Sequence, residues 1–322
     1  ANLLNEWMDA RWIHTQAFNE ADVRERRRPY FWRFWMNLPP KGQIGIHLSG
    51  RYSQPLLGYV YEKISRDEFL HMLEAINQFE MALADDGAML HKFWMHISKD
   101  VQRRRLESLE KDPLRSWRMS PLDWQHWEMY DRFIEASELI ITHTNTGHAP
   151  WEIIEGEDSN YRSLRVGEIL QQSLERHLMR TEIRQRYREA LNKELTAAGE
   201  ENGGASITPL PRTIMDELDL SLSLGKREYK NQLVEAQARL ANLQHKAMQQ
   251  GTTLMLVFEG PDAAGKGGAI RQVTHALDAR YYKVHPFSAP SDVENQFHYL
   301  WRFWRCVPRS GRVTIFDRSW YG

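Results

Sequence analysis

Cysteine is almost absent from this chain: Cys306 is the only one in 322 residues. A single cysteine excludes an internal disulfide and fits a reducing compartment, so we expect a cytoplasmic protein. Apolar runs are short, and none reaches the roughly 18 residues of a membrane-spanning helix, so we expect no membrane partner. Charge of one sign is lacking too, with 42 Lys and Arg against 43 Asp and Glu. A net charge of −1 gives no overall attraction for nucleic acid, and any polyanion site needs a local cluster of cations.

What the chain does contain is a glycine-rich turn, which reads GPDAAGKGG from Gly260 to Gly268. It follows the apolar run LMLVF at 254–258 and precedes a helical pattern, which is the setting of a P-loop, G-x-x-x-x-G-K-[ST]. Backbone N–H groups of such a turn, the helix N-terminus and the lysine converge on phosphate oxygens. The residues expected to bind phosphate are Gly260, Ala263, Ala264, Gly265, Lys266, Gly267 and Gly268.

One position departs from the P-loop pattern, because Gly267 stands where Ser or Thr would contact a metal ion. Asp317 ends a second predicted strand at 312–316, where a Walker-B carboxylate would hold Mg²⁺. Asp262 lies inside the turn itself, and we expect both carboxylates to replace the missing hydroxyl as magnesium ligands. Three alternatives stay open: Asp262 as a cap of the following helix, Asp317 as a turn residue, and Arg318 as a surface cation.

A long-range repeat runs through the chain. The string YLWRFW at 299–304 echoes YFWRFW at 30–35, and Asp278-Ala279-Arg280 echoes Asp9-Ala10-Arg11 at the same offset of 269 residues. No gap is needed between about residue 2 and residue 53 in this register. We interpret the match as a tandem duplication. At that offset the first copy's P-loop would fall before Ala1, and the second copy stops soon after the echo of Tyr52, so both copies are expected to be incomplete.

The order strand, loop, helix and strand favours an α/β fold, with a parallel sheet between two layers of helices in each copy. A polar stretch from Gly199 to Ser206 and the Pro-containing segment after it predict a linker. The expected domains are therefore 1–198 and 212–322, joined by 199–211. A long helix is predicted from Lys226 to Gln250, with Gly251 as its stop.

The turn GPDAAGKGG together with FDRSWYG at 316–322 resembles the polyphosphate kinase 2 family. The resemblance implies a P-loop kinase-like fold and transfer of a phosphoryl group between inorganic polyphosphate and a nucleotide. A duplicated domain is typical of the family's polyphosphate:AMP phosphotransferases, which make ADP from AMP. It further implies catalytic roles for Asp262, Lys266, Asp317 and Arg318, Mg²⁺ at Asp262 and Asp317, and polyphosphate and AMP or ADP as partners. Weaker candidates for polyphosphate contacts are Lys283, Arg305 and Arg309.

The first copy departs from the family pattern where chemistry is needed. Leu48 and Ser49 stand opposite Asp317 and Arg318, so neither a carboxylate nor a guanidinium is available there. We expect a degenerate, non-catalytic first domain, with His47 as a half-buried histidine rather than a metal ligand. Two other functions stay open, namely an ADP- or GDP-directed polyphosphate kinase and a non-catalytic module that binds polyphosphate or nucleotide. A homo-oligomer is possible as well.

Overall fold

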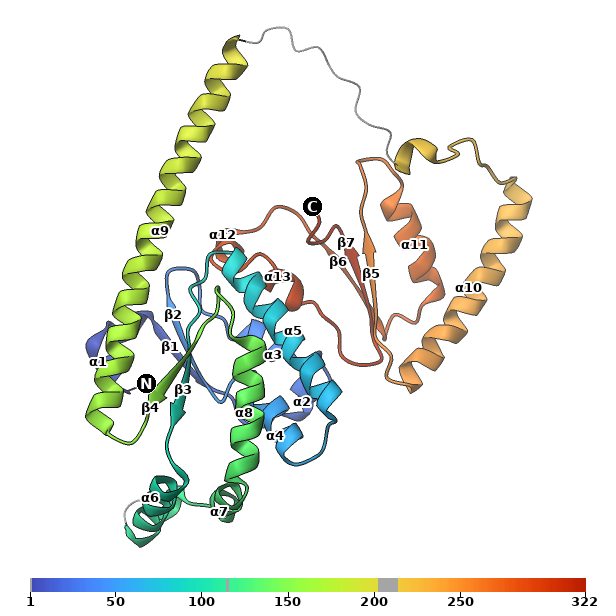
Figure 1. The fold of residues 1–322 in the computed structure, drawn as a ribbon. Helices are drawn as coiled ribbons and strands as arrows, with labels where there is room; N and C mark the ends of the chain where they lie inside the picture. Colours follow the sequence, from blue (N-terminus) through green and yellow to red (C-terminus); the bar gives the residue numbers. More distant parts are fainter. Residues whose placement is uncertain (1, 114–115, 202–213) are drawn as a thin grey trace.

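The computed structural model describes residues 2–113, 116–201 and 214–322, and its elements fall into two halves (Figure 1). The first half contains, in chain order, α1 (Asn2–Trp7), η1 (Ala10–Trp12), β1 (Ile13–Ala17), α2 (Val23–Arg26), α3 (Trp32–Met36), β2 (Ile44–Leu48), α4 (Ser53–Val60), α5 (Arg66–Asp85), β3 (Lys92–His96), α6 (Lys99–Lys111), η2 (Ser116–Arg118), α7 (Pro121–Glu128), α8 (Tyr130–Thr144), β4 (Trp151–Glu155) and α9 (Ser159–Glu201). The second half contains η3 (Ile214–Glu217), α10 (Lys226–Gln249), β5 (Leu254–Phe258), α11 (Lys266–Ala276), β6 (Tyr282–Pro286), α12 (Asp292–Asn295), α13 (Trp301–Trp304) and β7 (Val313–Asp317).

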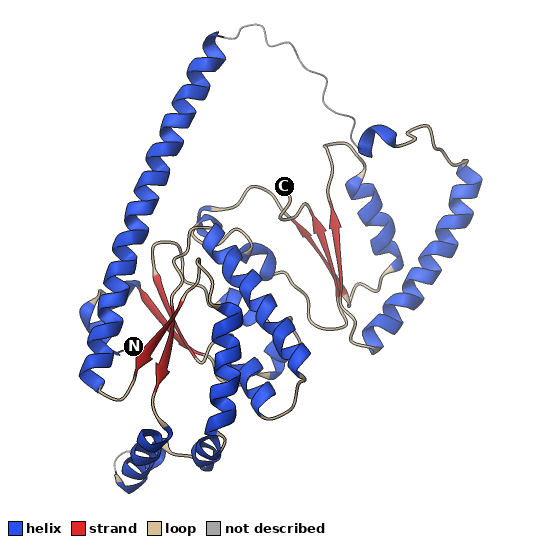
Figure 2. Cartoon of the chain, viewed as in Figure 1, coloured by secondary structure: helices blue, strands red, loops and turns tan. Residues whose placement is uncertain are grey.

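All strand pairs among the described residues are parallel, as the sequence predicts for an α/β fold (Figure 2). The second half has one sheet in the order β5-β7-β6, so the strand that ends at Asp317 lies in its centre. The first half differs from the expected single sheet, because β1 pairs with β2 and β3 pairs with β4 in two separate sheets. Within the described residues, no strand pairs with the second edge of β2 or of β3.

Helices cover these sheets through apolar faces. In the first half, α5 and α8 lie on one side of the strands and α9 on the other (Figure 1). The core between α5 and α8 is formed by Phe69, Leu73, Ile76 and Ile140, whose spacing on α5 is that of one helix face. In the second half, α11 packs on the sheet and α10 packs on α11. Among the described residues, no helix combines the length and apolar character needed to cross a membrane.

The boundaries of two long helices test the sequence analysis. Helix α10 agrees with the predicted span, and Gly251 follows it with a φ of 68°, a left-handed value that glycine adopts at low cost. Helix α9 is longer than expected, since it runs through Glu201 and includes residues 199–201, which were predicted to begin the linker. The rest of the predicted linker, 202–211, lies outside the described residues.

Elements recur at the offset of 269 residues. The bounds of β1, β2 and α2 coincide after this shift with those of β6, β7 and α12. Local contacts recur as well: Arg33 Nε lies 3.5 Å from Glu25, and Arg302 Nε lies 3.4 Å from Glu294. Both arginines also donate to a backbone carbonyl at 3.0 Å, that of Asn19 or Ser288. The repeated sequence therefore folds into the same local structure twice.

The two halves meet through these recurring elements. Trp35 of α3 stacks on Trp304 of α13, with ring centroids 5.6 Å apart and planes 17° apart. Around this pair, the Lys41 N–H donates to the Gln296 carbonyl at 2.6 Å, and the Ser310 N–H donates to the Arg27 carbonyl at 2.8 Å. Trp35 and Trp304 are counterparts under the 269-residue shift, and the same shift turns the Lys41–Gln296 contact into the Ser310–Arg27 contact. The interface is therefore approximately two-fold symmetric, as an isologous contact would be.

Candidate phosphate site

The turn from Gly260 to Gly265 joins the end of β5 to the start of α11, as the P-loop pattern predicts. Gly260 has a φ of 143° and Gly265 a φ of 87°, conformations in which a side chain would be strained. Gly265 is the residue immediately before α11, so the first N–H groups of this 11-residue helix open onto the turn. The local sequence thus places backbone donors and the partial positive charge of a helix at one point.

The acidic side of the site comes from β7. Phe258 and Asp317 are register partners on the neighbouring strands β5 and β7, so the turn and the carboxylate lie at the same sheet edge. The Arg318 N–H then donates to the Phe258 carbonyl at 3.1 Å, which fixes the start of the next turn beside the first. Arg318 has a φ of 65°, a left-handed value that is uncommon for a residue with a side chain.

A cavity of about 510 Å³ lies between these segments, and we call it the P-loop cavity. Its lining residues are Asp262, Ala263, Ala264, Gly265, Lys266, Gly267, Pro286, Phe287, Asp317 and Arg318. All four residues expected to be catalytic therefore lie around one space. Of the residues expected to bind phosphate, Gly260 lines a neighbouring pocket instead, and Gly268 lines neither space.

Ion pairs inside the cavity involve the charged groups that a phosphate would engage. The Lys266 ammonium donates to the carbonyls of Gly260 and Pro261, at 2.7 and 2.9 Å. Arg318 Nη2 lies 2.9 Å from Asp262 Oδ1, and the Asp262 side chain is 90% exposed. Asp262 thus pairs with Arg318 and does not cap α11, because no side chain caps that helix. Such exposed contacts are weak and can be exchanged for phosphate oxygens.

The donor set fits a magnesium ion that is shared with a phosphate ligand. Asp262 and Asp317 face the same cavity, and Mg²⁺ is commonly held by one or two carboxylates together with substrate phosphates. Within the described residues, no three His, Cys, Asp or Glu side chains are grouped closely enough to hold a metal by themselves. A Cβ at Gly267 would meet no atom within 4 Å, so the absence of a hydroxyl there does not arise from lack of space.

Two parts of the site were missed by the sequence analysis. Pro286 and Phe287 complete the cavity from the end of β6, and the rule that carboxyl ends of parallel strands meet at one edge could have indicated them. In contrast, Lys283, Arg305 and Arg309 line neither cavity, and Arg305 stacks on Trp301 at 4.6 Å. Their expected role as polyphosphate contacts therefore has no support in the geometry.

The corresponding turn of the first half keeps the backbone without the chemistry. Ser49 has a φ of 51°, close to that of Arg318, its counterpart after β7. Leu48 takes the place of Asp317 and is 44% exposed. His47 is half-buried and packs edge-on against Phe18, with centroids 5.1 Å apart. Burial lowers the pKa of His47 to about 4, which favours the neutral side chain expected of a packing residue.

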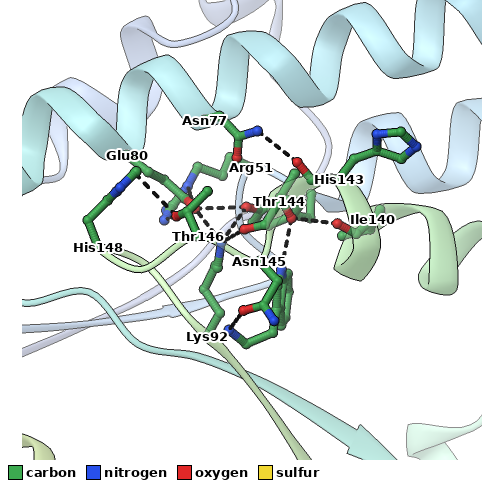
Figure 3. A network of polar contacts seen from close by, with 12 residues as sticks. Arg51, Asn77, Glu80, Lys92, Ile140, His143, Thr144, Asn145, Thr146 and His148 are labelled. Carbon is green, nitrogen blue, oxygen red and sulfur yellow. Dashed lines mark hydrogen bonds and ion pairs between the residues drawn. The ribbon is translucent and has the colours of Figure 1, made fainter.

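A separate concentration of charge lies inside the first half (Figure 3). The fully buried carboxylate of Glu80 accepts hydrogen bonds from Arg51 Nη2 at 2.7 Å, Lys92 Nζ at 2.7 Å and the Tyr52 hydroxyl at 2.8 Å. Lys92 also donates to the Thr144 carbonyl at 2.6 Å. Because these charged groups already have partners inside the protein, we assign the network to packing rather than to ligand binding.

A P-loop-like turn that faces an acid at the end of the adjacent parallel strand indicates an α/β protein with a candidate phosphate site. The family model of polyphosphate kinase 2 (PPK2) matches residues 2–182 and 223–322, and the chain belongs to this family.

Individual relatives agree with the family match. The chain is 45% identical over 320 residues to a polyphosphate:AMP phosphotransferase of Pseudomonas aeruginosa, with 99% of this chain and 62% of the relative covered. It is 32% identical over 163 residues to an AMP/ADP-polyphosphate phosphotransferase of Meiothermus ruber, with 51% of this chain and 61% of the relative covered. A solved structure from Pseudomonas aeruginosa, described as a polyphosphate kinase 2, superimposes with a TM-score of 0.80 at 42% identity and covers 100% of this chain and 60% of that one. The chain thus spans less than two thirds of the length of these relatives.

Proposed function

We propose that the protein transfers a phosphoryl group from inorganic polyphosphate to a nucleotide, with AMP as acceptor and ADP as product. The observation that carries this proposal is the P-loop cavity, where Lys266, Arg318, Asp262 and Asp317 surround one space. Cations bind the phosphate oxygens, and the two carboxylates suit a magnesium ion bridged to them. The names of the relatives from Pseudomonas aeruginosa and Meiothermus ruber support the donor and the acceptor.

The proposed reaction breaks the P–O bond to the terminal phosphoryl group of polyphosphate and forms a P–O bond to an oxygen of the AMP phosphate. That oxygen is anionic at neutral pH, so the protein needs no strong general base. Lys266 and the N–H groups of the turn orient the transferred group, and Arg318 leaves Asp262 to neutralise the charge that develops on it. Bound Mg²⁺ would supply further charge neutralisation, held by Asp262 and Asp317.

We further propose that the chain contains two copies of one domain, 1–198 and 212–322, with 199–211 between them, and that only the second copy is catalytic. Support comes from the coincident bounds of β1 and β6 and of β2 and β7 at an offset of 269 residues. In the first copy Leu48 cannot ligate a metal and Ser49 cannot supply a cation, although the turn that carries them is retained. Among the described residues, β2 pairs with β1 alone, whereas its counterpart β7 pairs with both β6 and the strand before the P-loop, β5.

The test uses the full-length protein with Mg²⁺, polyphosphate and AMP, ADP or GDP in turn, and product analysis identifies the acceptor. Lys266→Ala and Asp317→Ala are each expected to lower the rate of ADP formation by about 10²–10³, the usual cost of a preorganised charge. Lys246→Ala is the matched control, because this exposed lysine of α10 in the same half lines neither pocket. Wild-type rates of ADP formation in both site variants would refute the assignment. If GDP or ADP is phosphorylated faster than AMP, that nucleotide is the acceptor instead of AMP.

A further inference from the structure

A second pocket, of about 480 Å³, adjoins the P-loop cavity and shares Phe287 and Arg318 with it. We call it the adjoining pocket; its lining residues belong to the segments 259–260, 287–303 and 318–322, together with Lys41. Among these described residues, Lys41 alone comes from the first half of the chain. The half that has no P-loop thus supplies a cation to a space beside the P-loop of the other half.

The position of Lys41 is fixed by contacts on both sides. Its backbone N–H donates to the Gln296 carbonyl at 2.6 Å, so the main chain is attached to the wall of the adjoining pocket. Its ammonium lies 3.1 Å from Asp86 Oδ2, and the side chain is 53% exposed. Asp86 belongs to the first half and lies outside the lining, so the acid that pairs with the ammonium does not occupy the pocket.

The remaining charges of the adjoining pocket are largely paired within it. Arg302 lies 3.4 Å from Glu294, and the Glu259 carboxylate accepts from the Ser319 hydroxyl at 2.6 Å. Lys41 and Arg318 are the two lining cations whose carboxylate partners lie outside this pocket. The Arg318–Asp262 pair is exposed on both sides, whereas in the other pair Lys41 is 53% and Asp86 only 21% exposed. Both cations are therefore accessible to a ligand, and an accessible ion pair is exchanged at little cost.

The mirrored position in the second half lacks this feature. Ser310 is the counterpart of Lys41 at the 269-residue offset and makes the matching backbone contact, to the Arg27 carbonyl. Its hydroxyl, however, donates to the Gly251 carbonyl of its own half at 2.6 Å. Of the two equivalent positions in this symmetric interface, only Lys41 is charged. The cation thus comes from the half without the P-loop and lies beside the half that has it.

We infer that Lys41 is a substrate-binding residue, supplied by the first half, for a nucleotide seated in the adjoining pocket. The inference rests on the proposed function. Aromatic walls from Phe297, Tyr299 and Trp320 suit a planar base, whereas a polyphosphate chain has no apolar surface to place against them. The ligand's phosphate would reach the P-loop cavity past Arg318, and the Lys41 ammonium would donate to the ligand from the opposite rim.

Steady-state kinetics of the full-length protein test this inference. Lys41→Met is expected to raise the KM for AMP about tenfold, the value of one hydrogen bond from a charged donor, with the KM for polyphosphate changed less than about twofold. Lys41→Arg keeps the charge and is expected to stay within about threefold of wild type. Lys63→Met, an exposed lysine of the same half outside the pocket, is the matched control.

Asp86→Asn separates binding from a structural role, because it breaks the ion pair but keeps the ammonium. An unchanged or lower KM for AMP supports the inference, whereas a rise equal to that of Lys41→Met makes the pair structural and overturns it. A raised KM for polyphosphate alone would overturn the choice of ligand. Calorimetric titration with AMP, without turnover, keeps the two proposals distinct: if wild type binds AMP more tightly than Lys41→Met but forms no ADP, the proposed function fails and the role of Lys41 stands. Equal AMP affinity of the two proteins refutes the role of Lys41.

Discussion

Replacement of Glu80 by glutamine tests how strongly the buried network holds the first half together (Figure 3). The carboxylate is fully buried and accepts from Arg51, Lys92 and Tyr52, so the two cations and one anion sum to a net charge of +1 inside the protein. Burial lowers the pKa of Lys92, and the charge of Glu80 opposes that effect. Glutamine keeps the shape of the side chain but leaves both cations without a counter-charge.

The expected loss follows from this geometry. Removing one partner of a buried ion pair costs about 3–5 kcal/mol, because an uncompensated charge remains out of water. Lys92→Met should cost less, about 1–3 kcal/mol, since Arg51 and Glu80 remain as a neutral pair and only the hydrogen bonds of Lys92 are lost. The double variant Glu80→Gln with Lys92→Met should be less destabilised than the two single losses predict together, since one of the two unpaired cations is gone.

Urea denaturation of the full chain, followed by circular dichroism, measures these differences from the midpoints and slopes. Glu74→Gln is the matched control, because Glu74 lies on the exposed face of the same helix, α5, and its loss should change stability by less than about 0.5 kcal/mol. If Glu80→Gln behaves like Glu74→Gln, or if its loss simply adds to that of Lys92→Met, the network does not act as a coupled unit and the reasoning is wrong.

Two further predictions concern His47 and the contact between the halves. The pKa of His47 is lowered to about 4 in the folded state, so between pH 6.5 and 4 the unfolded state binds the extra proton and stability falls as pH falls. Between pH 7 and 5 this should cost about 2 kcal/mol; His47→Phe should remove that part of the loss in urea denaturation at the two pH values, and an unchanged loss would contradict it. Trp304→Ala removes the ring that stacks on buried Trp35 and should cost about 2–4 kcal/mol, whereas Trp12→Ala, at an exposed ring, should cost far less; equal midpoints for the two variants would exclude a stabilising contact.

Much of the phosphate site could be predicted from sequence because its residues lie in two short segments at the ends of strands. Residues 260–268 and 317–318 are each local patterns, and parallel strands bring such ends to one edge. Phe287 was missed because it shares no motif with them and reaches the cavity only through the position of β6. Lys41 was missed for a stronger reason: no local pattern of the first half specifies that its backbone is bound to Gln296 of the second.

The separation of the first-half strands into two sheets also could not be predicted, since strand pairing is decided by how the elements pack and not by the strands' own residues. The length of α9 was underestimated because Gly199 was interpreted as a break, yet the helix continues past it. A single glycine costs about 1 kcal/mol in a helix, which the many good helix formers around it offset.

The first half repeats the backbone of the candidate phosphate site without its charged side chains. Its turn after β2 keeps the left-handed backbone at Ser49, although Leu48 and Ser49 supply neither a carboxylate nor a guanidinium. Its contact elements keep more: Trp35 still stacks on its counterpart Trp304, and the backbone contact of Lys41 still matches that of Ser310. If the two halves are copies, the parts that face the partner half retained their side-chain roles, while the parts that would face a ligand in the first half did not. A purely structural role for the first half would explain the stacked rings but not the difference in charge, since Lys41 lines the adjoining pocket and Ser310 does not. The contribution of Lys41 to nucleotide binding therefore decides whether the first half only supports the active half or also completes its site.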